Sequence, residues 1–444
     1  PPGLWSRSGI CVHGSGGLFY VERLKIEKHT IYSKRFTSFT IKDFCYLESY
    51  FIIVNSNIKK GGKGMLELDV EQFWKDEETA HEENCFSKSA SQVALGIRMS
   101  GECVFAELGE KGEPWGYISP ERRYELNCRY NEKAVKIVGR PMLPEIKPEK
   151  KKREVAIPEF RQIGEVFGGQ YVFEGGTLWL NRTLKGEREL ARKLDEVEQM
   201  IDNPEQFRAF VLPKDWDERC RAAYEMYGIR PKQYMHVRGP VTLATSVYGT
   251  EDLLYLYYDA PELFTRFADV IGDVILAYIE LFIKESGNDE NCFRHGFSFA
   301  DDNSYLMTPE MYRNFGYRVL KKVFGRTSPD PGDGRYQHSD SAMGHLIPLL
   351  SDFNLTGCNF GPTVTVREIR KYMPHTRIDG QLAPFTFMRN NEADIVAEVK
   401  RDCEAAKEND ARGLNFGTAG SINNGSLLTS LRIVMAAIQN YGRY

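Results

Sequence analysis

The sequence of 444 residues lacks the patterns that mark several large classes of protein. Its nine cysteines include no Cys-x-x-Cys pair, and their odd number argues against a disulfide framework and for reduced thiols. We expect most of these cysteines to be small buried side chains. No apolar run approaches the ~18 residues of a membrane span. The apolar stretch Phe44–Val54 is short and is interrupted by Glu48.

An excess of basic residues is also lacking. The chain has 58 Lys and Arg against 62 Asp and Glu, a formal net charge of -4. A protein dedicated to nucleic acid needs a basic face that displaces counterions from phosphates, so this balance argues against that class. The chain is 42% hydrophobic and 27% charged, as globular proteins are. We expect a cytoplasmic enzyme with a small-molecule substrate, no nucleic-acid partner and no membrane partner.

The first part of the chain, residues 1–64, differs from the rest. It shows neither the pattern of a signal peptide nor a sustained helical period. Lys59–Gly64 is rich in Lys and Gly, whose codons are purine-rich, as a bacterial ribosome-binding sequence read through as protein would be. We hypothesise that the native chain begins at Met65 and that residues 65–444 form the folded domain. A genuine N-terminal extension is the alternative, and N-terminal sequencing of the native protein would distinguish the two.

Two features precede the regular part of the domain. Arg140–Phe160 is rich in Pro and Lys, which predicts an exposed loop or linker. Gly186–Val211 carries apolar residues at helical spacing, and Asn203-Pro204 in its middle provides a stop followed by a new start. We therefore predict a pair of surface helices after an exposed loop.

From Tyr234 onward, short apolar strands alternate with longer amphipathic helices, the pattern of βα units around a parallel sheet. The predicted strands are Tyr234–Gly239, Gly296–Asp301, Gly334–Ser339, Leu355–Phe360, His375–Gly380 and Gly413–Thr418. The predicted helices between them include Pro261–Ser286, Thr308–Phe324 and Asn391–Glu408.

Phosphate-binding glycine motifs are absent from this region. A doubly wound nucleotide-binding sheet would carry Gly-x-Gly-x-x-Gly or a P-loop directly after a strand, and neither spacing occurs. Six successive βα units, with two more strands expected upstream, instead predict an α/β fold of the (β/α)8 TIM-barrel type. In such barrels the chemistry lies at the carboxyl ends of the strands.

His338 and Asp340 stand at one of these strand ends. Residues i and i+2 of a strand face the same side, so both side chains can reach one ligand. Two roles suit them: a pair of metal ligands, or a histidine kept basic by a carboxylate. The alternative is a histidine satisfied in the core, with Asp340 capping a helix that begins near Ser341.

Other strand ends carry further polar candidates. Of Asp301 and Asp302, one is expected to bond substrate or backbone amides. His236 and Arg238 share one side of a strand, where Arg238 suits either an anionic substrate group or an inter-strand ion pair. Asp379 ends another strand. Asn415 precedes a Gly- and Asn-rich loop whose backbone amides suit a carboxylate or phosphate.

Taken in order, these stretches resemble the uroporphyrinogen decarboxylase superfamily, which includes the haem-pathway decarboxylase and the corrinoid-dependent cobamide:thiol methyltransferases. The resemblance covers roughly the last half of the chain, and the family fold is the (β/α)8 barrel. The matching stretches are Gly239–Thr245, Asp301–Phe315, His338–Asn359, Asp379–Pro384 and Asn415–Ser426.

The methyltransferase branch carries His-x-Cys at the fifth strand and a further Cys in the last loop, which together bind Zn²⁺. Here the first pair reads His338-Ser339-Asp340, and the last loop, Thr418-Ala419-Gly420, has no cysteine. The resemblance then implies a site for a divalent metal such as Zn²⁺, built on His338 and Asp340 with an oxygen ligand such as Asp302. Cys358 is a further candidate ligand, with a buried structural thiol as the alternative.

The decarboxylase branch carries an Arg-Gln-x-Gly-Arg signature that Arg161–Glu165 echoes only in part, because the last position is Glu. We therefore expect a methyltransferase that moves a methyl group between a corrinoid protein and a small substrate. Decarboxylation of a porphyrinogen and a non-catalytic barrel that binds a corrinoid protein are the alternatives. The predicted catalytic residues are His338, Asp340 and Asp302, and the predicted substrate contacts are Arg238, His236, Asp301, Asp379 and Asn415.

Overall fold

A computed structural model describes residues 9–14, 17–22, 66–148, 155–174, 177–287 and 293–444. The chain divides into two units, Pro1–Met65 and Leu66–Tyr444. In the first unit the described residues form an antiparallel hairpin of β1 (Gly9–Gly14) and β2 (Gly17–Glu22). The native start at Met65 stays a prediction.

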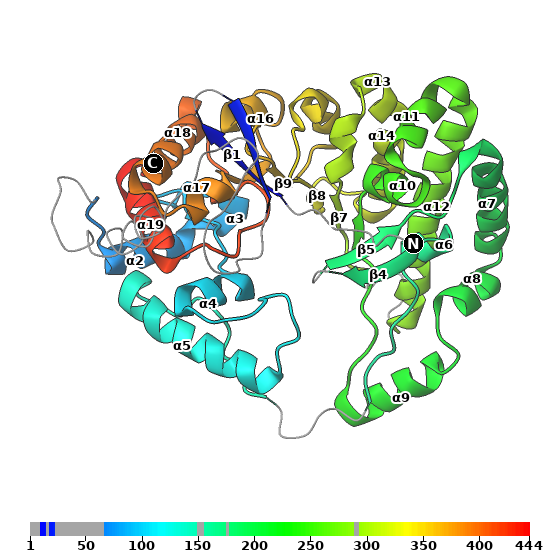
Figure 1. Cartoon of the computed structure of the whole chain (residues 1–444), viewed down its shortest axis with the longest axis horizontal. Coiled ribbons are helices and arrows are strands. Elements are labelled where there is room, and N and C mark those ends of the chain that lie inside the picture. Colours follow the sequence, from blue (N-terminus) through cyan, green and yellow to red (C-terminus); the bar gives the residue numbers. More distant parts are fainter. Residues whose placement is uncertain (1–8, 15–16, 23–65, 149–154, 175–176, 288–292) are drawn as a thin grey trace. The chain divides into compact units, whose positions relative to one another are not determined.

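The second unit contains a seven-stranded sheet in which every neighbouring pair of strands is parallel (Figure 1). Each of the six strands predicted from the sequence is present, and a short seventh strand precedes them. The strands are β3 (Ala94–Leu95), β6 (His236–Arg238), β7 (Phe297–Ala300), β8 (Arg335–Ser339), β9 (Gly357–Phe360), β10 (Arg377–Leu382) and β11 (Leu414–Thr418).

The strand order is β3-β11-β10-β9-β8-β7-β6. From β6 to β11 each strand lies beside the next one along the chain, without the reversal at a switch point that defines a doubly wound sheet. The first two strands, β3 and β6, lie at opposite edges. Among the described residues no eighth strand joins them. The structure thus confirms an α/β fold with a parallel sheet, and its closure into the predicted barrel stays a prediction.

Helices connect and cover the strands. Between β3 and β6 lie α4 (Gly101–Leu108), α5 (Pro120–Val138), α6 (Ile163–Val166), the hairpin β4 (Gln170–Glu174) and β5 (Thr177–Asn181), α7 (Gly186–Ile201), α8 (Pro204–Val211) and α9 (Trp216–Tyr227). Before β3 lie α2 (Val70–Ala80) and α3 (Glu82–Cys85). From β6 onward come α10 (Pro240–Tyr248), α11 (Thr250–Asp259), α12 (Pro261–Glu285), α13 (Pro309–Asn314), α14 (Gly316–Thr327), α15 (Ile347–Leu350), α16 (Val366–Tyr372), α17 (Pro384–Met388), α18 (Glu392–Ala406) and α19 (Leu428–Tyr441). Short 3-10 turns are η3 (Asp302–Leu306), η4 (Gly344–Leu346), η5 (Ser351–Phe353) and η6 (Glu408–Asp410).

The predicted pair of surface helices is confirmed as α7 and α8. The side chain of Asn203 accepts a hydrogen bond of 3.1 Å from the backbone N–H of Gln206, and Pro204 occupies the first turn of α8. The predicted loop is confirmed over residues 140–148 and 155–160, which contain neither helix nor strand.

One predicted helix is broken in two. The sequence predicted a single helix over Thr308–Phe324, but α13 ends and α14 begins at Phe315, whose φ and ψ are -125° and -89°. The ring of Phe315 is fully buried, with its centroid 4.8 Å from that of Phe264 and 5.7 Å from that of Phe267. The interruption coincides with the packing of this ring against α12. A hydrophobic pattern along the chain cannot predict such a contact between distant residues.

The longest described helix, α12, contributes many residues to the core, with Phe264, Ile271 and Tyr278 fully inaccessible. Within the described ranges, the structure contains no helix whose length and apolarity would suffice for a membrane crossing. The predicted location in the cytoplasm stays a prediction.

Candidate active site

Strand pairing gathers the predicted polar residues on one face of the sheet. Arg238 lies opposite Ala300, Ala300 opposite His338, and His338 opposite Asn359. Asp379 lies opposite Asn415 in the same way. Because directly paired residues of a parallel sheet point to the same side, these polar side chains share a face. The residues that alternate with them are buried on the opposite, helix-covered face: Val237, Phe299, Gln337, Cys358, Ile378 and Leu414.

His338 and Asp340 form a pair at the carboxyl end of β8, and Asp302 joins them from the end of β7. The Nε2 atom of His338 lies 3.1 Å from Oδ1 of Asp340. The backbone N–H of Asp340 donates a hydrogen bond of 2.7 Å to Oδ1 of Asp302. One nitrogen of His338 and one carboxylate oxygen from each aspartate all lie within 4.8 Å of one another. The structure therefore brings together the three residues predicted to be catalytic.

Asn359 determines which nitrogen of His338 carries the proton. The Nδ2 group of Asn359 donates to the backbone carbonyls of Asp379 and Thr418, so its Oδ1 is the atom left for His338. The distance between Nδ1 of His338 and that oxygen is 2.8 Å. Since a carbonyl oxygen can only accept, Nδ1 of His338 carries the hydrogen. In the neutral ring, Nε2 then presents its lone pair toward Asp340.

The carboxylates also control the charge of the ring. The hydrogen bond to Asp340 raises the pKa of His338, and the charges of Asp340 and Asp302 add to the effect, against the opposing effect of burial. A cation at this position would replace the proton that Nε2 shares with Asp340. One imidazole nitrogen and two carboxylates, with the second ring nitrogen fixed by Asn359, form a ligand set that suits Zn²⁺ and similar divalent ions. These residues therefore fit a metal ion.

Asp301 is held by helix α10. Its side chain is 0% exposed, and its Oδ1 accepts hydrogen bonds from the backbone N–H and the hydroxyl of Thr242, at 2.8 and 2.9 Å. Its Oδ2 accepts a longer bond of 3.4 Å from the N–H of Val241. The expectation that Asp301 contacts substrate is thus corrected. Its carboxylate caps the amino end of α10 from the interior, and Asp302 is the aspartate at the strand ends.

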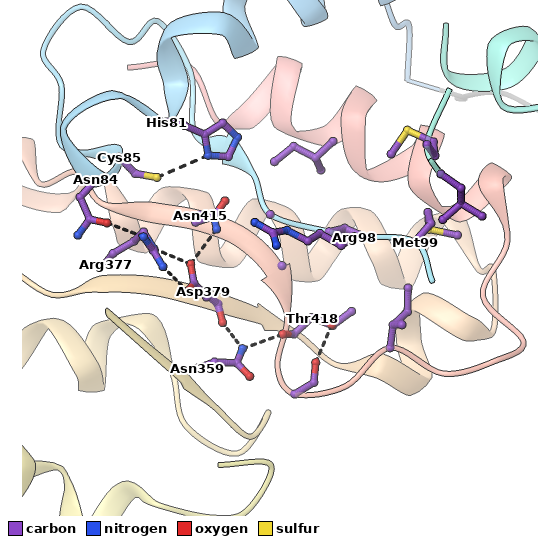
Figure 2. Close-up of a pocket in the computed structure, with 18 of the residues that line it drawn as sticks. His81, Asn84, Cys85, Arg98, Met99, Asn359, Arg377, Asp379, Asn415 and Thr418 are labelled. Carbon is purple, nitrogen blue, oxygen red and sulfur yellow. Dashed lines mark hydrogen bonds and ion pairs between the residues drawn. The ribbon is translucent and has the colours of Figure 1, made fainter. Parts of the chain in front are cut away.

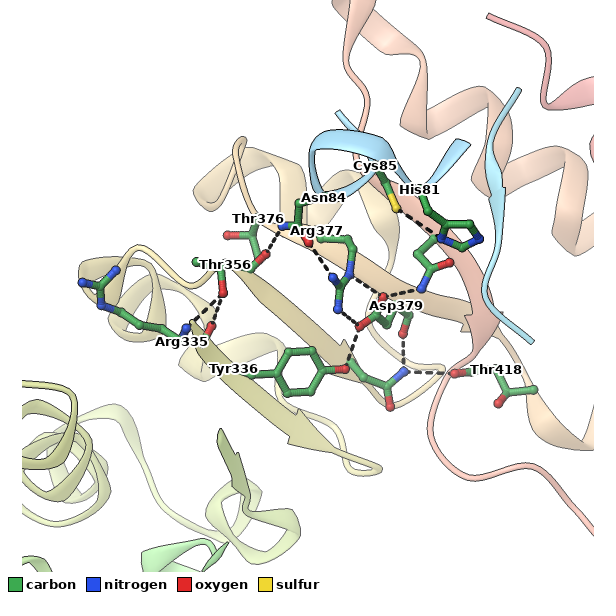
Figure 3. A network of polar contacts seen from close by, with 12 residues as sticks. His81, Asn84, Cys85, Arg335, Tyr336, Thr356, Thr376, Arg377, Asp379 and Thr418 are labelled. Atoms are coloured by element: carbon green, nitrogen blue, oxygen red, sulfur yellow. Dashed lines mark hydrogen bonds and ion pairs between the residues drawn. The ribbon is translucent and has the colours of Figure 1, made fainter. Parts of the chain in front are cut away.

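Asp379 is the centre of a polar network on the open face (Figure 3). Arg377 donates to both of its carboxylate oxygens at 2.8 Å, Tyr336 donates to Oδ2 at 2.9 Å, and Asn415 donates to Oδ1 at 2.7 Å. With these four donors, the carboxylate of Asp379 is already saturated. Asp379 and Asn415 were predicted to contact the substrate. In the structure they bond to each other, Asp379 also bonds to Arg377 and Tyr336, and both residues form part of the cavity wall.

His236 and Arg238, on β6, lie on the same face of the sheet as His338. Nδ1 of His236 lies 2.8 Å from the hydroxyl of Ser298. Burial and the nearby ring of His338 lower the pKa of His236, so this ring is neutral at pH 7. Arg238 is exposed and has no ion-pair or hydrogen-bond partner in the described part of the chain. The inter-strand ion pair considered for Arg238 is thus not formed there, which leaves its guanidinium available to an anion.

A cavity of about 1180 Å³ opens over the same face (Figure 2). Its wall includes Tyr336, Asn359, Asp379, Asn415 and Thr418, so it reaches Asn359, the residue that holds His338. This volume accommodates a substrate considerably larger than a single amino acid.

The family model of uroporphyrinogen decarboxylase (URO-D) matches residues 196–441, more than half of the chain. The chain belongs to the URO-D family. Among solved structures, a methyltransferase from Methanosarcina mazei is similar to it, with 14% sequence identity and a TM-score of 0.47. The similarity covers 79% of this chain and 94% of that one. A search of curated proteins found no match.

In this member of the URO-D family, Cys358 does not point toward the strand ends where His338 and Asp340 lie. Its side chain is fully buried on the helix-covered face, and burial raises the pKa of its thiol to about 12. A thiol in this environment is a structural side chain and not a metal ligand. The last loop approaches the site through Gly420, where an added Cβ would lie 2.3 Å from Oδ1 of Asp340.

Sequence reasoning missed the part of the site that comes from the chain before β6. Arg98, Arg140, His81 and Cys85 all line the cavity. The strand that positions Arg98, β3, has only two residues, which is too short to show an alternating pattern. The charged residue directly after the apolar run Val93–Ile97 is the one signal that pointed there.

Proposed function

We propose that this URO-D family chain is an enzyme that moves a methyl group between a corrinoid, carried by a partner protein, and a small substrate bound in the cavity. The reaction would take place at a divalent metal ion held by His338, Asp340 and Asp302. The observation that carries the proposal is the convergence of one imidazole nitrogen and two carboxylates beside the cavity.

When bound, the metal would supply a Lewis acid that lowers the pKa of a substrate thiol, hydroxyl or water. The residues of the chain have separate tasks. Asn359 holds the ring of His338, and Arg238 binds an anionic group of the substrate. His236, neutral at pH 7, can accept a proton at its second ring nitrogen.

The proposal includes the closed (β/α)8 barrel of the family. In the observed sheet the strand order runs in one direction, and the first two strands, β3 and β6, occupy the two edges. A barrel opened between these strands has this order. We place the missing strand between them, so that the ends of β7 and β8 would face a barrel mouth.

Decarboxylation of a polycarboxylate is the second candidate function, and the arginines favour it. Arg98 lines the cavity and Arg238 lies on the same face of the sheet, and neither has a hydrogen-bond or ion-pair partner among the described residues. Unpaired guanidinium groups are suited to substrate carboxylates, and His338 would then protonate the developing carbanion. This reaction needs no metal, so metal content separates the two candidates.

The experiment is metal analysis by mass spectrometry on anaerobically purified protein, with His338→Ala, Asp340→Ala and Asp302→Asn beside the wild type. The chain offers a matched control in His295, Asp330 and Asp333, a second cluster of the same composition. There Nδ1 of His295 lies 3.1 Å from Oδ2 of Asp333. These residues precede β7 and β8 and therefore lie at the amino ends of the strands, away from the proposed metal site at the carboxyl ends. His295→Ala should therefore retain the metal.

We expect about one metal ion per chain in the wild type and in His295→Ala, and at least a tenfold lower content in the three site variants. Transfer of a methyl group from methylcobalamin to small thiols and alcohols then tests the reaction. A metal-free wild type that decarboxylates polycarboxylates would support the second candidate. Binding of a corrinoid protein without turnover of any methyl donor would support a non-catalytic barrel.

A further inference from the structure

A histidine and a cysteine line one end of the cavity: His81 lies between α2 and α3, and Cys85 lies on α3 (Figures 2 and 3). The buried Glu77 of α2 contacts His81. The Sγ atom of Cys85 lies 4.0 Å from Nδ1 of His81. On the other side of the ring, Nε2 of His81 lies 2.8 Å from Oε1 of Glu77. A thiol, a base and a group that orients the base are the parts of an activated nucleophile.

Glu77 holds the ring of His81 in one tautomer. The carboxylate is 5% exposed and accepts hydrogen bonds from the backbone N–H of Leu95, at 2.8 Å, and from the side chain of Gln92, at 3.2 Å. As an acceptor it requires that Nε2 of His81 carry a hydrogen. Nδ1 of His81 is then free to take the proton of Cys85. Hydrogen bonds to Cys85 and Glu77 raise the pKa of His81 to about 9, so the protonated ring is stable at pH 7.

The backbone aims Cys85 at this histidine. Glu83, Asn84 and Cys85 have φ values of 49°, 57° and 67°, a left-handed turn that residues with side chains rarely adopt. Asn84 ties the turn to the sheet, because its Nδ2 donates to the carbonyl of Thr356 at 2.8 Å and its Oδ1 accepts from Arg377. The turn is thus fixed at both sides, and Cys85 is a member of the cavity wall.

Positive charge surrounds the same cavity. Arg98 and Arg140 line it. Arg98 is exposed and has no hydrogen-bond or ion-pair partner among the described residues, while Arg140 stacks on the ring of Trp74. Arg377 reaches the turn that carries Cys85, where it donates a hydrogen bond to Oδ1 of Asn84. An electropositive setting of this kind favours the thiolate and attracts anions.

We propose that Cys85 is a nucleophilic thiol, activated by His81 and positioned through Glu77, and that it reacts with an electrophile carrying an acidic group. In the reaction the thiol proton moves to Nδ1 of His81. The sulfur then forms a bond to carbon, and the leaving group departs with the electron pair of the bond that breaks. This site does not depend on the metal at His338 or on the proposed methyl transfer.

Alkylation with iodoacetate and with iodoacetamide tests the proposal on the full-length chain. Peptide mass spectrometry follows each cysteine separately, and iodide is the leaving group in both cases. Cys128 serves as the reference within the same chain, because it is partly exposed whereas Cys85 is only 4% exposed. An ordinary thiol is a few per cent ionised at pH 7, so full ionisation can raise its rate by up to ~30-fold. We expect Cys85 to react at least about 10-fold faster than Cys128.

The variants separate activation from charge recognition. His81→Gln should lower the rate at Cys85 by about 10-fold. Arg98→Met should lower the ratio of the iodoacetate rate to the iodoacetamide rate at Cys85, and should not change that ratio at Cys128. An unchanged circular dichroism spectrum would show that the variants fold. The comparison of the rates at Cys85 and Cys128 within the wild-type chain does not depend on the variants. A rate at Cys85 equal to or below that at Cys128 in the wild type would overturn the proposal.

Glu77 acts through His81, and its role can be tested by the pH dependence of the alkylation rate at Cys85. The titratable or charged groups that influence Cys85 are His81, Glu77, Arg377 and Tyr444. In the wild type the alkylation rate at Cys85 should change less between about pH 6 and about pH 8 than in Glu77→Gln, because the hydrogen bond from Glu77 helps to keep His81 protonated beside the sulfur. In Glu77→Gln the rate should rise with pH like that of a free thiol. A wild-type profile as steep as that of Glu77→Gln would contradict this role of Glu77.

Discussion

Replacement of Asp301 by Asn should change how the stability of this protein depends on pH. Burial raises the pKa of Asp301 from 3.8 to about 6, although hydrogen bonds from Thr242 oppose the rise. The folded state therefore binds the proton more tightly than the unfolded state does. This contribution to stability is fully present below pH 3.8 and is lost as the pH rises through about 6. An Asn side chain keeps an acceptor for Thr242 and cannot ionise.

The magnitude follows from the two pKa values. Their difference, at 1.36 kcal/mol per pH unit, corresponds to roughly 3 kcal/mol in total. About 2 kcal/mol of this falls between about pH 4.5 and about pH 7, because part of the loss has already occurred at the lower pH. The free energy of unfolding of the wild type, minus that of Asp301→Asn, should therefore decrease by about 2 kcal/mol over this range.

Urea unfolding followed by tryptophan fluorescence at several pH values measures this difference. The substitution also alters the contact with Val241, but that effect is the same at every pH and cancels in the comparison. Titration of other groups cancels as well, since both chains contain them. If the difference were constant, or increased with pH, Asp301 would be ionised in the folded protein, and the reasoning from burial would be refuted.

Three further substitutions address the site and its surroundings. Asn359→Leu removes the acceptor for His338 and two bonds to backbone carbonyls. It should cost about 2–4 kcal/mol in stability and weaken metal binding by about 10- to 100-fold, measured by thermal unfolding and metal titration; wild-type affinity would argue against a role for Asn359. Gly420→Ala places a Cβ 2.3 Å from Asp340, at a φ of 98°, and should reduce metal content by at least about 10-fold; unchanged content would show that the loop can move aside. Cys358→Ala should leave metal content unchanged and cost about 1–2 kcal/mol in thermal or urea unfolding; loss of metal would restore Cys358 as a ligand.

Much of the sheet could be predicted from the sequence. The strands from β6 to β11 are short segments that are each followed by a helix, and this alternation along the chain can be recognised without knowledge of distant contacts. Strand β3 escaped because it has two residues and is recognised only by its pairing with β11. The interruption at Phe315 escaped for a similar reason, since it accompanies packing of the ring against α12.

The candidate site divides in the same way. That His338 and Asp340 face one side follows from the two-residue period of a strand. The partner Asp302 could be named as a candidate but could not be distinguished from Asp301, because the two are adjacent and both follow the same strand. The distinction depends on α10, whose free N–H groups lie beside Asp301 and bind its carboxylate.

The sequence by itself therefore determined the order of the βα units, the absence of a soft ligand set at the strand ends and the shared face of His338 and Asp340. These are local properties of spacing and residue type. Only the tertiary structure decided that Asn359 orients His338, that Asp301 is sealed inside, and that Cys85 meets His81 in a cavity with Arg98. Each of these contacts depends on how neighbouring strands and a turn are packed. The four-residue spacing of His81 and Cys85 does not by itself show that the two side chains line a cavity with Arg98.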